Sequence, residues 1–545
     1  MFNFFIRLFK SFSKKEFLVF LIVGGVFLIS SALALAEAVI QKTKTVAVGG
    51  GDYTEGIVGQ PSFVNPILAN SDADRDLVKL TFSDLKQLAE SYKVDEKGKI
   101  WHYRLKDGVK WQDGEKITSD DIIFTIETIQ NPDVYSPIFQ NWQGVVVKRI
   151  SEREVEFDLP APYAFFKAAL EDLRPAPKHI FAKIPTANLK LSDYNLNPIA
   201  SGPYKVVNFK KQSDGFIDFY LLERNENYSG DKAYLKKFKV VFYGGEDELI
   251  SAFNNGEIDG FGLANVFNLD KIVSPHEIFP LKTLKYYAVF FNSYSHPALK
   301  EKNIRMVLDS AINKNELVDK IFKGYASPVY GPLLSANQFS KSVDINEVLD
   351  KSGWLRGDDG IRQKTIGKEL VKMEFTLVAP QIQILADTAE LIKQKWEEFG
   401  IKTNVSIVSL SEINNEIIKT RNYQMIIFGN ILGKSPDLYS FWHSSEKFYP
   451  GLNLSLYENK SADRLIESIR ENFDEEERTS DLEKLQSMIV SDYPAIFLYS
   501  PDYLYVGKKK FYRFESSGEE DYISFAGDRF NNVEKWYVET TRVLK

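Results

Sequence analysis

The sequence contains no cysteine among its 545 residues. This absence excludes disulfide bonds, thiolate metal sites, iron–sulfur clusters, a cysteine nucleophile and a lipid anchor attached to cysteine. Histidine is also scarce, and the five histidines show neither an HExxH motif nor any other pairing at metal-ligand spacing: His102, His179, His276, His296 and His443. We therefore expect no metal site, no cofactor and no zinc-dependent catalysis.

The chain also lacks long blocks of one charge. Its net charge of -7 results from 68 basic and 75 acidic residues, which is modest for this length and gives no basic surface for nucleic acid. Nucleic acid is therefore excluded as an expected partner. The 44% hydrophobic and 26% charged residues are typical of a globular protein, and roughly 100 to 200 residues per domain predicts two to four domains. We expect a monomer.

Residues 17–36, FLVFLIVGGVFLISSALALA, contain no charged residue. A helix of about 20 apolar residues is long enough to cross the roughly 30 Å hydrocarbon core of a membrane. Basic residues dominate the preceding segment 1–16, so the positive-inside rule places it in the cytoplasm and the rest of the chain outside. The alternative is a cleaved signal peptide, because residues 34–36 form an A-x-A site. We expect a retained single-pass anchor in the cell membrane, with a secreted or periplasmic protein as the alternative.

Residues 37–52 are mixed in composition and end in three glycines, which predicts a flexible linker, and the folded part is expected from Tyr53 onward. Beyond that point there is no internal repeat and no low-complexity tract. Apolar runs of period 2 alternate with runs of period 3.6, which predicts a mixed α/β architecture.

Local patterns predict several elements. In residues 101–105, WHYRL, apolar and polar residues alternate as in a half-buried strand, and the following Asp-Gly predicts a hairpin with residues 109–111 as the return strand. Thr118, with Asp121 three residues later, predicts a capping box that opens a helix, and the Pro after Asn131 ends it. Apolar residues over 384–399, a Gly at position 400 and the run 401–407 predict a helix followed by a strand.

Residues 101–132, WHYRLKDGVKWQDGEKITSDDIIFTIETIQNP, resemble the signature of the peptide- and nickel-binding family of ABC-transporter solute-binding proteins, also called family 5. The similarity continues in the order of that family through residues 175–180, 201–204, 223–228, 255–259, 290–292, 305–313, 353–354 and 451–453. It covers nearly the whole exported chain. At residues 200–204 the chain has ASGPY where the family has a TGTGPY-like loop.

This resemblance implies a two-lobed fold like that of type II periplasmic binding proteins, with a small extra domain inserted. The expected parts are lobe I from residues 53–85, 199–285 and 500–545, the inserted domain II from residues 86–198, and lobe III from residues 286–499. Residues 198–204 are expected to be a crossing point between such parts. The implied function is capture of a peptide-like ligand between the lobes and its delivery to the permease of an ABC importer, with no catalytic residues.

The resemblance also directs attention to residues 59–66 and 428–442 as segments that face the cleft. The candidate ligand-binding residues on these segments are Gln60, Phe63, Asn65, Phe428, Gly429, Asn430, Tyr439 and Trp442. The two aromatic residues Tyr439 and Trp442 have an equal alternative as a helix packing stripe. His443, the single histidine near the expected cleft, is more typical of a structural residue than of a metal ligand.

In peptide-binding members of the family, an Asp about four residues before a Pro pairs with the α-ammonium of the ligand. Counting back from Pro436 gives Leu432, so that ion pair is expected to be absent here. A buried ammonium without a partner costs several kcal/mol. Either Asn430 substitutes or the ligand has no free amine. Asp437 is a further candidate, although an Asp in a loop is more often a turn or cap residue.

Two other functions remain open. A ligand sensor or an extracytoplasmic chaperone would use the same fold and cleft, because a fold alone does not fix a function. A membrane-anchored peptide hydrolase would need a serine nucleophile, but neither a G-x-S-x-G nor an S-x-x-K motif lies beside a suitable base.

Overall fold

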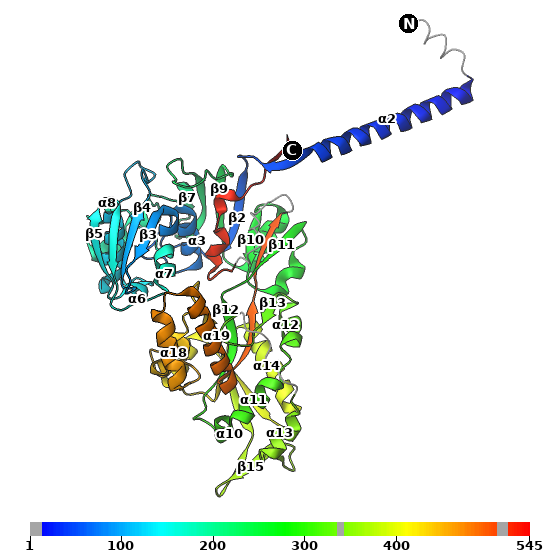
Figure 1. Ribbon diagram of the computed structural model, residues 1–545. Coiled ribbons are helices and arrows are strands. Elements are labelled where there is room, and N and C mark those ends of the chain that lie inside the picture. Colours follow the sequence, from blue (N-terminus) through cyan, green and yellow to red (C-terminus); the bar gives the residue numbers. More distant parts are fainter. Residues whose placement is uncertain (1–12, 335–342, 509–521) are drawn as a thin grey trace.

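The computed structural model describes residues 13–334, 343–508 and 522–545. Residues 1–12, with Arg7 and Lys10 of the expected cytoplasmic segment, lie outside this description, as do residues 335–342 of the expected lobe III and 509–521 of the expected lobe I. The described chain forms an elongated body of two halves with one helix projecting from it (Figure 1).

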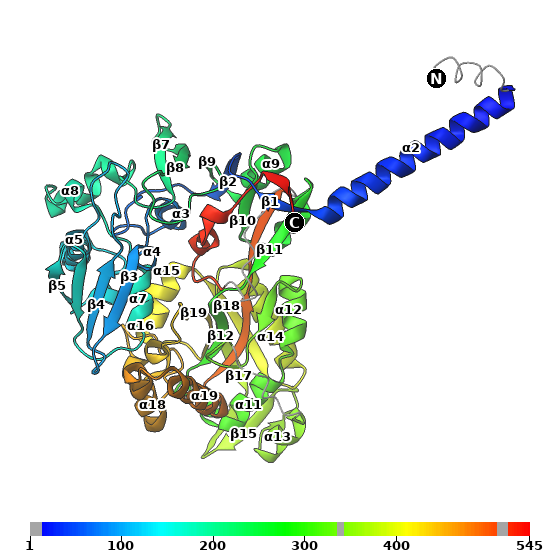
Figure 2. The ribbon, with the colours of Figure 1, turned by 45° about the horizontal axis from the view of Figure 1, so that its top comes forward.

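The projecting helix is α2 (Lys14–Lys42), which leaves the body in both ribbon views (Figures 1 and 2). Its most apolar window has a mean hydropathy of 2.6 and is not buried inside the protein. Ser13 caps the helix in a box with Glu16. By length and composition this helix can cross a membrane, and it extends beyond the predicted span 17–36 at both ends.

The expected flexible linker is not what the structure shows. Residues 37–42 continue α2, and residues 43–47 form the strand β1 (Thr43–Ala47), which pairs antiparallel with β22 (Thr540–Leu544). The helix continues because residues 37–42 contain no Gly or Pro. The strand forms because a partner almost 500 residues further along the chain supplies its hydrogen bonds, and no local pattern indicates that partner.

Lobe I is built on a seven-stranded sheet with the order β11-β21-β10-β2-β9-β8-β7. Its strands come from three separated stretches of the chain: β2 (Asp52–Val58), β7 (Tyr204–Lys211), β8 (Ile217–Arg224), β9 (Lys237–Tyr243), β10 (Gly260–Leu263), β11 (His276–Leu281) and β21 (Tyr503–Lys508). The helical segments of this lobe are α3 (Asp72–Thr81), α9 (Glu246–Asn255), η4 (Val266–Lys271), η7 (Ala526–Phe530) and η8 (Val533–Lys535).

Domain II contains a four-stranded antiparallel sheet with the order β3-β4-β6-β5. Its strands are β3 (Ala89–Val94), β4 (Ile100–Leu105), β5 (Val146–Ser151) and β6 (Glu154–Asp158). Short helices surround it: α4 (Leu85–Leu88), α5 (Ser119–Gln130), η1 (Pro132–Val134), α6 (Phe139–Trp142), α7 (Phe166–Asp172), α8 (Lys178–Phe181), η2 (Thr186–Leu191) and η3 (Asp193–Asn195).

The local predictions for domain II are partly correct. Strand β4 forms, and α5 begins after the capping residue Thr118, with Asp121 completing the box. The predicted return strand 109–111 is wrong: β4 pairs with β3 and β6, and the segment after it makes only one isolated bridge, between Lys110 and Lys116. The reason is tertiary, because Trp111 is fully buried and packs against Phe82 instead of continuing a ladder.

Lobe III is built on a six-stranded sheet with the order β13-β20-β12-β19-β17-β18. Its strands are β12 (Lys285–Phe291), β13 (Ala326–Pro328), β17 (Glu374–Pro380), β18 (Lys402–Val408), β19 (Met425–Ile431) and β20 (Ala495–Pro501). A separate three-stranded sheet at the end of the lobe consists of β14 (Leu355–Arg356), β15 (Arg362–Ile366) and β16 (Glu369–Lys372) (Figure 1).

Helices cover the lobe III sheet. They are α10 (Pro297–Lys300), α11 (Lys302–Ser310), α12 (Lys314–Phe322), α13 (Ile345–Lys351), α14 (Gln383–Glu397), α15 (Leu410–Glu412), η5 (Ile413–Ile417), α16 (Ile418–Thr420), α17 (Tyr439–Trp442), η6 (Ser444–Lys447), α18 (Lys460–Glu471) and α19 (Glu475–Asp492). The predicted helix over 384–399 and the strand after it are confirmed as α14 and β18. Gly400 joins them with a φ of 78°, a conformation that favours glycine.

Two strands carry the chain between the lobes. Strand β12 follows β11 into lobe III, and β20 returns to β21 of lobe I. At this crossing, Thr283 Oγ1 donates to the carbonyl of Pro501 at 2.6 Å, and Lys282 pairs with Asp502 at 3.1 Å. Two short adjacent connections of this kind form a hinge about which packed lobes can rotate.

A buried ionic cluster fixes the C-terminal segment to the core of lobe I. Arg529 contacts Asp76 at 2.7 Å and Glu55 at 3.0 Å, and all three side chains are almost fully buried. Tyr505 donates its hydroxyl proton to Glu55 at 2.6 Å. Because one guanidinium cannot compensate two buried carboxylates, burial outweighs Arg529 and raises the pKa of Glu55 to about 7.

The stability of lobe I should therefore fall as pH rises through about 7. Folded Glu55 keeps a proton that the unfolded chain, with an ordinary glutamate pKa of 4.5, releases. The stabilisation is complete below the unfolded pKa and is lost above the folded one, with a size on the order of 3 kcal/mol. Urea unfolding from pH 5 to pH 8 measures it. Relative to the wild type, Glu55→Gln should lose this part of the pH dependence, and identical profiles would contradict the assignment.

Candidate functional site

Six charged side chains meet where lobe I, domain II and lobe III approach one another, and we call them the junction cluster: Lys79, Asp84, Asp172, Arg174, Lys434 and Asp528. Lys434, from the loop after β19, pairs with Asp172 at the end of α7. Arg174 pairs with Asp84 at 3.1 Å, and Lys79 approaches Asp528 at 3.6 Å. The Lys434 contact is the one that joins lobe III to domain II in this cluster.

Burial and neighbouring charges act in opposite directions on the pKa values of several groups in the junction cluster. Burial, together with the nearby guanidinium of Arg174, lowers the pKa of Lys79 to about 8. Burial alone would lower the pKa of Lys434 and raise that of Asp528. Asp172 outweighs burial at Lys434 and raises its pKa, and the ammonium groups of Lys79 and Lys434 lower that of Asp528. Three cations therefore face three carboxylates in the junction cluster.

A second contact between domain II and lobe III centres on Arg470 of α18. Its Nε lies 3.2 Å from Asp437 Oδ2, and its guanidinium covers the rings of Tyr163 at 5.0 Å and Tyr439 at 4.4 Å. Tyr163 of domain II donates its hydroxyl proton to Asp437 at 2.8 Å. The carbonyl of Arg470 accepts a further hydrogen bond from Ala164 at 2.7 Å. These bonds join domain II to lobe III.

Replacing Arg470 by Gln should weaken this contact. The side chain is 34% exposed, so solvent screens part of the interaction and the expected loss of unfolding free energy is about 1 kcal/mol. Urea unfolding of the purified protein measures the loss. Arg464→Gln is the matched control, because Arg464 lies on the same helix, is exposed and, among the residues that the structure describes, bonds only to Ser461. Equal effects of the two substitutions would show that Arg470 does not hold the lobes together.

A pocket of about 720 Å³ lies beside this contact, between domain II and α18. Tyr163, Tyr439 and Arg470 line one side, and the proline-containing loop 159–162 lines another. Its volume is within the range of small-ligand sites, roughly 300 to 1,000 Å³. Because its walls belong to two parts joined through a hinge, rotation of the lobes changes its shape.

Gln60, Phe63 and Asn65 lie in the loop after β2. Gln60 Oε1 accepts a hydrogen bond from the backbone of Ile217 at 2.7 Å. Asn65 is buried and bonds to Asn195 at 2.9 Å. Phe63 is half-buried against the core shared by lobe I and domain II. The structure thus gives each of these three side chains a partner within the protein.

Phe428, Gly429 and Asn430 lie on β19, opposite β12. Asn430 is buried and donates its amide to the hydroxyl of Tyr286 at 2.9 Å. A Cβ at Gly429 would lie 2.9 Å from the ring of Tyr287, so glycine permits the close approach of that ring. Phe428 is half-buried against the lobe III core. A role for Asn430 as an amine-binding group stays a prediction.

The two aromatic candidates on α17 differ. Trp442 is fully buried and packs against Phe290, Phe497 and Tyr457, with ring centroids 5.6 to 6.3 Å apart. Tyr439 is half-buried at the wall of the 720 Å³ pocket and stacks on His443 at 4.3 Å. The alternative of a packing stripe describes Trp442, while Tyr439 faces the pocket.

The loop between β19 and α17 carries the residues named for the amine. Leu432 donates its backbone N–H to Leu284 of the hinge at 2.8 Å. Asp437 Oδ1 accepts from the N–H of Tyr439 at 3.0 Å, in addition to its bonds to Tyr163 and Arg470. Asp437 therefore acts as a cap and as an ion-pair partner, and its charge is already compensated within the protein.

Sequence reasoning missed Lys434, Asp172, Tyr163 and Arg470. The available signal for Lys434 was its charge within residues 428–442, a segment expected to face the cleft. No signal indicated the others, because their partners lie on distant segments of the chain.

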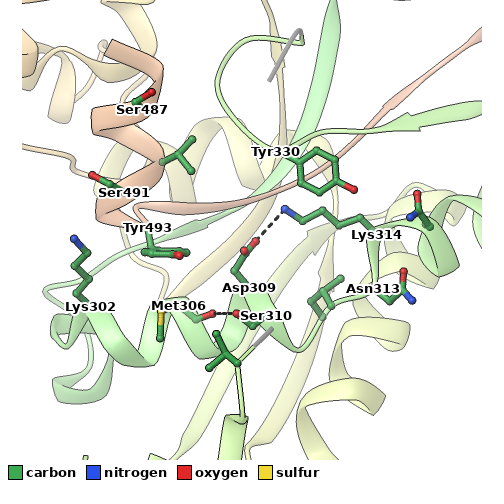
Figure 3. A pocket seen from close by; sticks show the side chains of 14 residues that line it. Lys302, Met306, Asp309, Ser310, Asn313, Lys314, Tyr330, Ser487, Ser491 and Tyr493 are labelled. Carbon is green, nitrogen blue, oxygen red and sulfur yellow. Dashed lines mark hydrogen bonds and ion pairs between the residues drawn. The ribbon is translucent and has the colours of Figure 1, made fainter. Parts of the chain in front are cut away.

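Another pocket, of about 670 Å³, lies within lobe III between α11, α19 and the segment of Tyr330 (Figure 3). Lys314 points toward Asp309, at 3.1 Å, and its ammonium lies 4.8 Å from the ring of Tyr330. The buried cation is thus compensated inside the protein. No residue of this pocket was predicted from the sequence.

Within residues 13–334, 343–508 and 522–545, no three His, Asp or Glu side chains are placed to hold a metal ion. His443 stacks on Tyr439 and bonds through Nδ1 to Ser445 at 2.8 Å. These contacts describe a structural histidine.

A family model described as bacterial extracellular solute-binding proteins, family 5 Middle, matches residues 85–449. The chain belongs to this family. The members are binding proteins rather than enzymes, which agrees with the two lobes, the hinge strands and the pocket between domain II and lobe III. The predicted mixed α/β, two-lobed fold of family 5 is therefore confirmed.

Individual proteins resemble this family 5 chain over most of its length. The oligopeptide-binding protein AppA of Bacillus subtilis is 27% identical over 488 residues, covering 83% of this chain and 87% of that protein. A solved structure of AppA from Bacillus subtilis in complex with a nonapeptide has a TM-score of 0.66 at 24% identity, covering 91% of this chain and 100% of that one. The substrate-binding protein CtaP of Listeria monocytogenes has a TM-score of 0.75 at 24% identity, covering 90% and 100%.

Proposed function

We propose that this protein captures a peptide between its lobes and delivers it to the permease of an ABC importer while α2 holds it in the membrane. The observation that carries the proposal is the hinge, together with the contacts between lobe III and domain II. Across the boundary with domain II, Lys434 of lobe III pairs with Asp172, while Asp437 and Arg470 of lobe III both contact Tyr163. Contacts between the lobes add to the stability of the arrangement in which they form, so a ligand that binds this arrangement better shifts the protein toward it.

A peptide is the favoured ligand. AppA is similar to this chain over most of both proteins, and it is an oligopeptide-binding protein whose structure holds a nonapeptide. Main-chain hydrogen bonds combined with roomy side-chain pockets give affinity with little sequence preference. The carboxylate of Asp437 is already used by Arg470 and Tyr163, and Leu432 offers no charge. We therefore infer that a free α-amine contributes little to the affinity.

A retained anchor is favoured over a cleaved signal peptide by the structure of α2. The helix has 29 residues and continues through residues 34–36 without a break. The apolar core of a signal peptide has about 7 to 15 residues. Delivery to a permease also gains from an anchor, because tethering raises the local concentration of the binding protein at the membrane.

Native mass spectrometry of the full chain, extracted from membranes without refolding, tests the proposed function. We expect additional masses that correspond to bound peptides, and an intact N-terminal segment. Adding matched pairs of free and N-acetylated peptides should raise the melting temperature by similar amounts, as mass action requires of true ligands. A chain that carries no peptide, and that none of a peptide library stabilises, would overturn the peptide assignment and turn attention to sugars and metal chelates.

A further inference from the structure

The ladder of β1 and β22 joins the anchor helix directly to the last strand of the chain. Helix α2 ends at Lys42 and β1 begins at Thr43, so no residue separates them. Thr43 pairs with Leu544, and the N–H of Lys545 donates to the carbonyl of Lys42 at 3.0 Å. At the other end, the N–H of Val48 donates to Glu539 at 3.0 Å. Figures 1 and 2 show the ladder at the base of α2, outside the lobe I sheet.

The ladder is basic. Lys42, Lys44, Arg542 and Lys545 are all exposed, and in the described part of the chain none of them forms an ion pair. Directly opposite residues of an antiparallel pair lie on the same face and neighbours alternate between faces. Lys44 pairs with Val543, and Arg542 pairs with Thr45. Each face therefore carries a cation.

The ladder also exposes apolar side chains at the end nearest to α2. Leu544 is 79% exposed, and Ile40 in the last turns of the helix is 56% exposed. A two-stranded ladder is marginally stable by itself in water. Exposed apolar residues beside unpaired cations are the combination that binds at the boundary between lipid headgroups and acyl chains.

The position of the ladder decides which partner it meets. If α2 spans the membrane, as in the proposed function on which this inference rests, its apolar part ends within a turn or two of Lys42. A strand rises about 3.3 Å per residue, and a charged surface acts over roughly 8 to 10 Å at physiological salt. Lys42, Lys44 and Lys545 then lie within reach of the headgroups.

We propose that the β1–β22 ladder is a stem that binds anionic phospholipid headgroups on the outer surface of the membrane. Lys42, Lys44 and Lys545 attract the headgroups, with Arg542 further along the ladder adding to the positive potential, and Leu544 enters the boundary beside α2. Hydrogen bonds along the ladder tie this contact to both ends of the folded body. The stem thereby restricts how far the lobes swing away from the membrane, and hence from a permease in it.

The test uses the full chain in lipid nanodiscs. Because the protein has no cysteine, Thr541→Cys places a single spin label on the ladder, and Lys368→Cys places one on the β15–β16 hairpin as a control. In discs with phosphatidylglycerol, the accessibility of the label at 541 to an aqueous relaxation agent should be about threefold lower than in discs of phosphatidylcholine alone. The accessibility of the label at 368 should be the same in both kinds of disc.

A variant with Lys42, Lys44, Arg542 and Lys545 replaced by Gln should lose the lipid dependence at position 541 with an unchanged melting temperature. A label equally accessible in both lipids, or a lipid dependence that survives this substitution, would overturn the stem. Failure of the proposed membrane anchor gives a different result from failure of the stem. Without the anchor, the chain would leave the discs or show a mass that lacks its N-terminal segment.

Discussion

Replacing Trp442 by alanine should lower the free energy of unfolding by about 3 to 5 kcal/mol, the usual cost of removing a large buried aromatic side chain. Trp442 is fully buried, and its ring packs against Phe290 and Phe497. The indole therefore fills the lobe III core. Urea unfolding at pH 7 measures the effect, and peptide affinity should change only through the loss of folded protein.

Two variants control this result. Trp442→Phe keeps an aromatic ring and should recover more than half of the loss. Phe448→Ala removes an aromatic side chain that is 68% exposed nearby in the sequence, and such surface changes are usually within about 0.5 kcal/mol. If Trp442→Ala unfolds like the wild type but fails to bind peptide, Trp442 is a pocket residue and the packing assignment is wrong.

Replacing Arg529 by methionine should cost a similar amount, about 3 to 5 kcal/mol, because it leaves Glu55 and Asp76 buried without a counter-charge. The loss should be larger at pH 8 than at pH 5. Burial already raises the pKa of both carboxyls despite Arg529, and without it they stay protonated in the folded protein to still higher pH. That stabilisation is present at low pH and is lost as pH rises.

The combined variant Arg529→Met, Glu55→Gln and Asp76→Asn should recover much of the stability, since it removes the charges as well as the guanidinium. Arg104→Met is the surface control, because Arg104 is 51% exposed and pairs with the exposed Glu90. A loss that does not depend on pH, or that the combined variant does not relieve, would show that Arg529 acts by packing alone.

Local patterns in the sequence predicted those elements whose stabilising contacts are local. The capping box of Thr118 and Asp121 is made within four residues, and α5 begins where it was expected. The α14–β18 unit follows equally from periodicity and Gly400. The overall two-lobed fold followed from the family signature rather than from these patterns.

Strand pairing was not predictable in the same way. The hairpin expected after β4 does not form, because β4 finds its partners in β3 and in β6, about 50 residues later. The linker expected before Tyr53 became β1 for the same reason, with β22 as its partner. A single sequence shows where a strand can form but not which strand completes its ladder.

The candidate site was likewise predicted at the level of its segments but not at the level of individual side chains. The loop 428–442 does reach the boundary between lobe III and domain II, through Lys434 and Asp437. The side chains within it were not separable in advance, since Tyr439 and Trp442 lie three residues apart and one faces a pocket while the other fills the core. Arg470 escaped notice because its role depends on Tyr163, about 300 residues away.

The most direct test of the central claim is a distance measurement across the closing boundary. Because the chain has no cysteine, Asp133→Cys in domain II and Lys460→Cys at the start of α18 provide a single pair of dye sites for fluorescence energy transfer. If the protein captures peptides by closing its lobes, a peptide that raises the melting temperature should also shift the transfer efficiency to one narrow, higher value. Unchanged transfer at saturating peptide would contradict capture by closure.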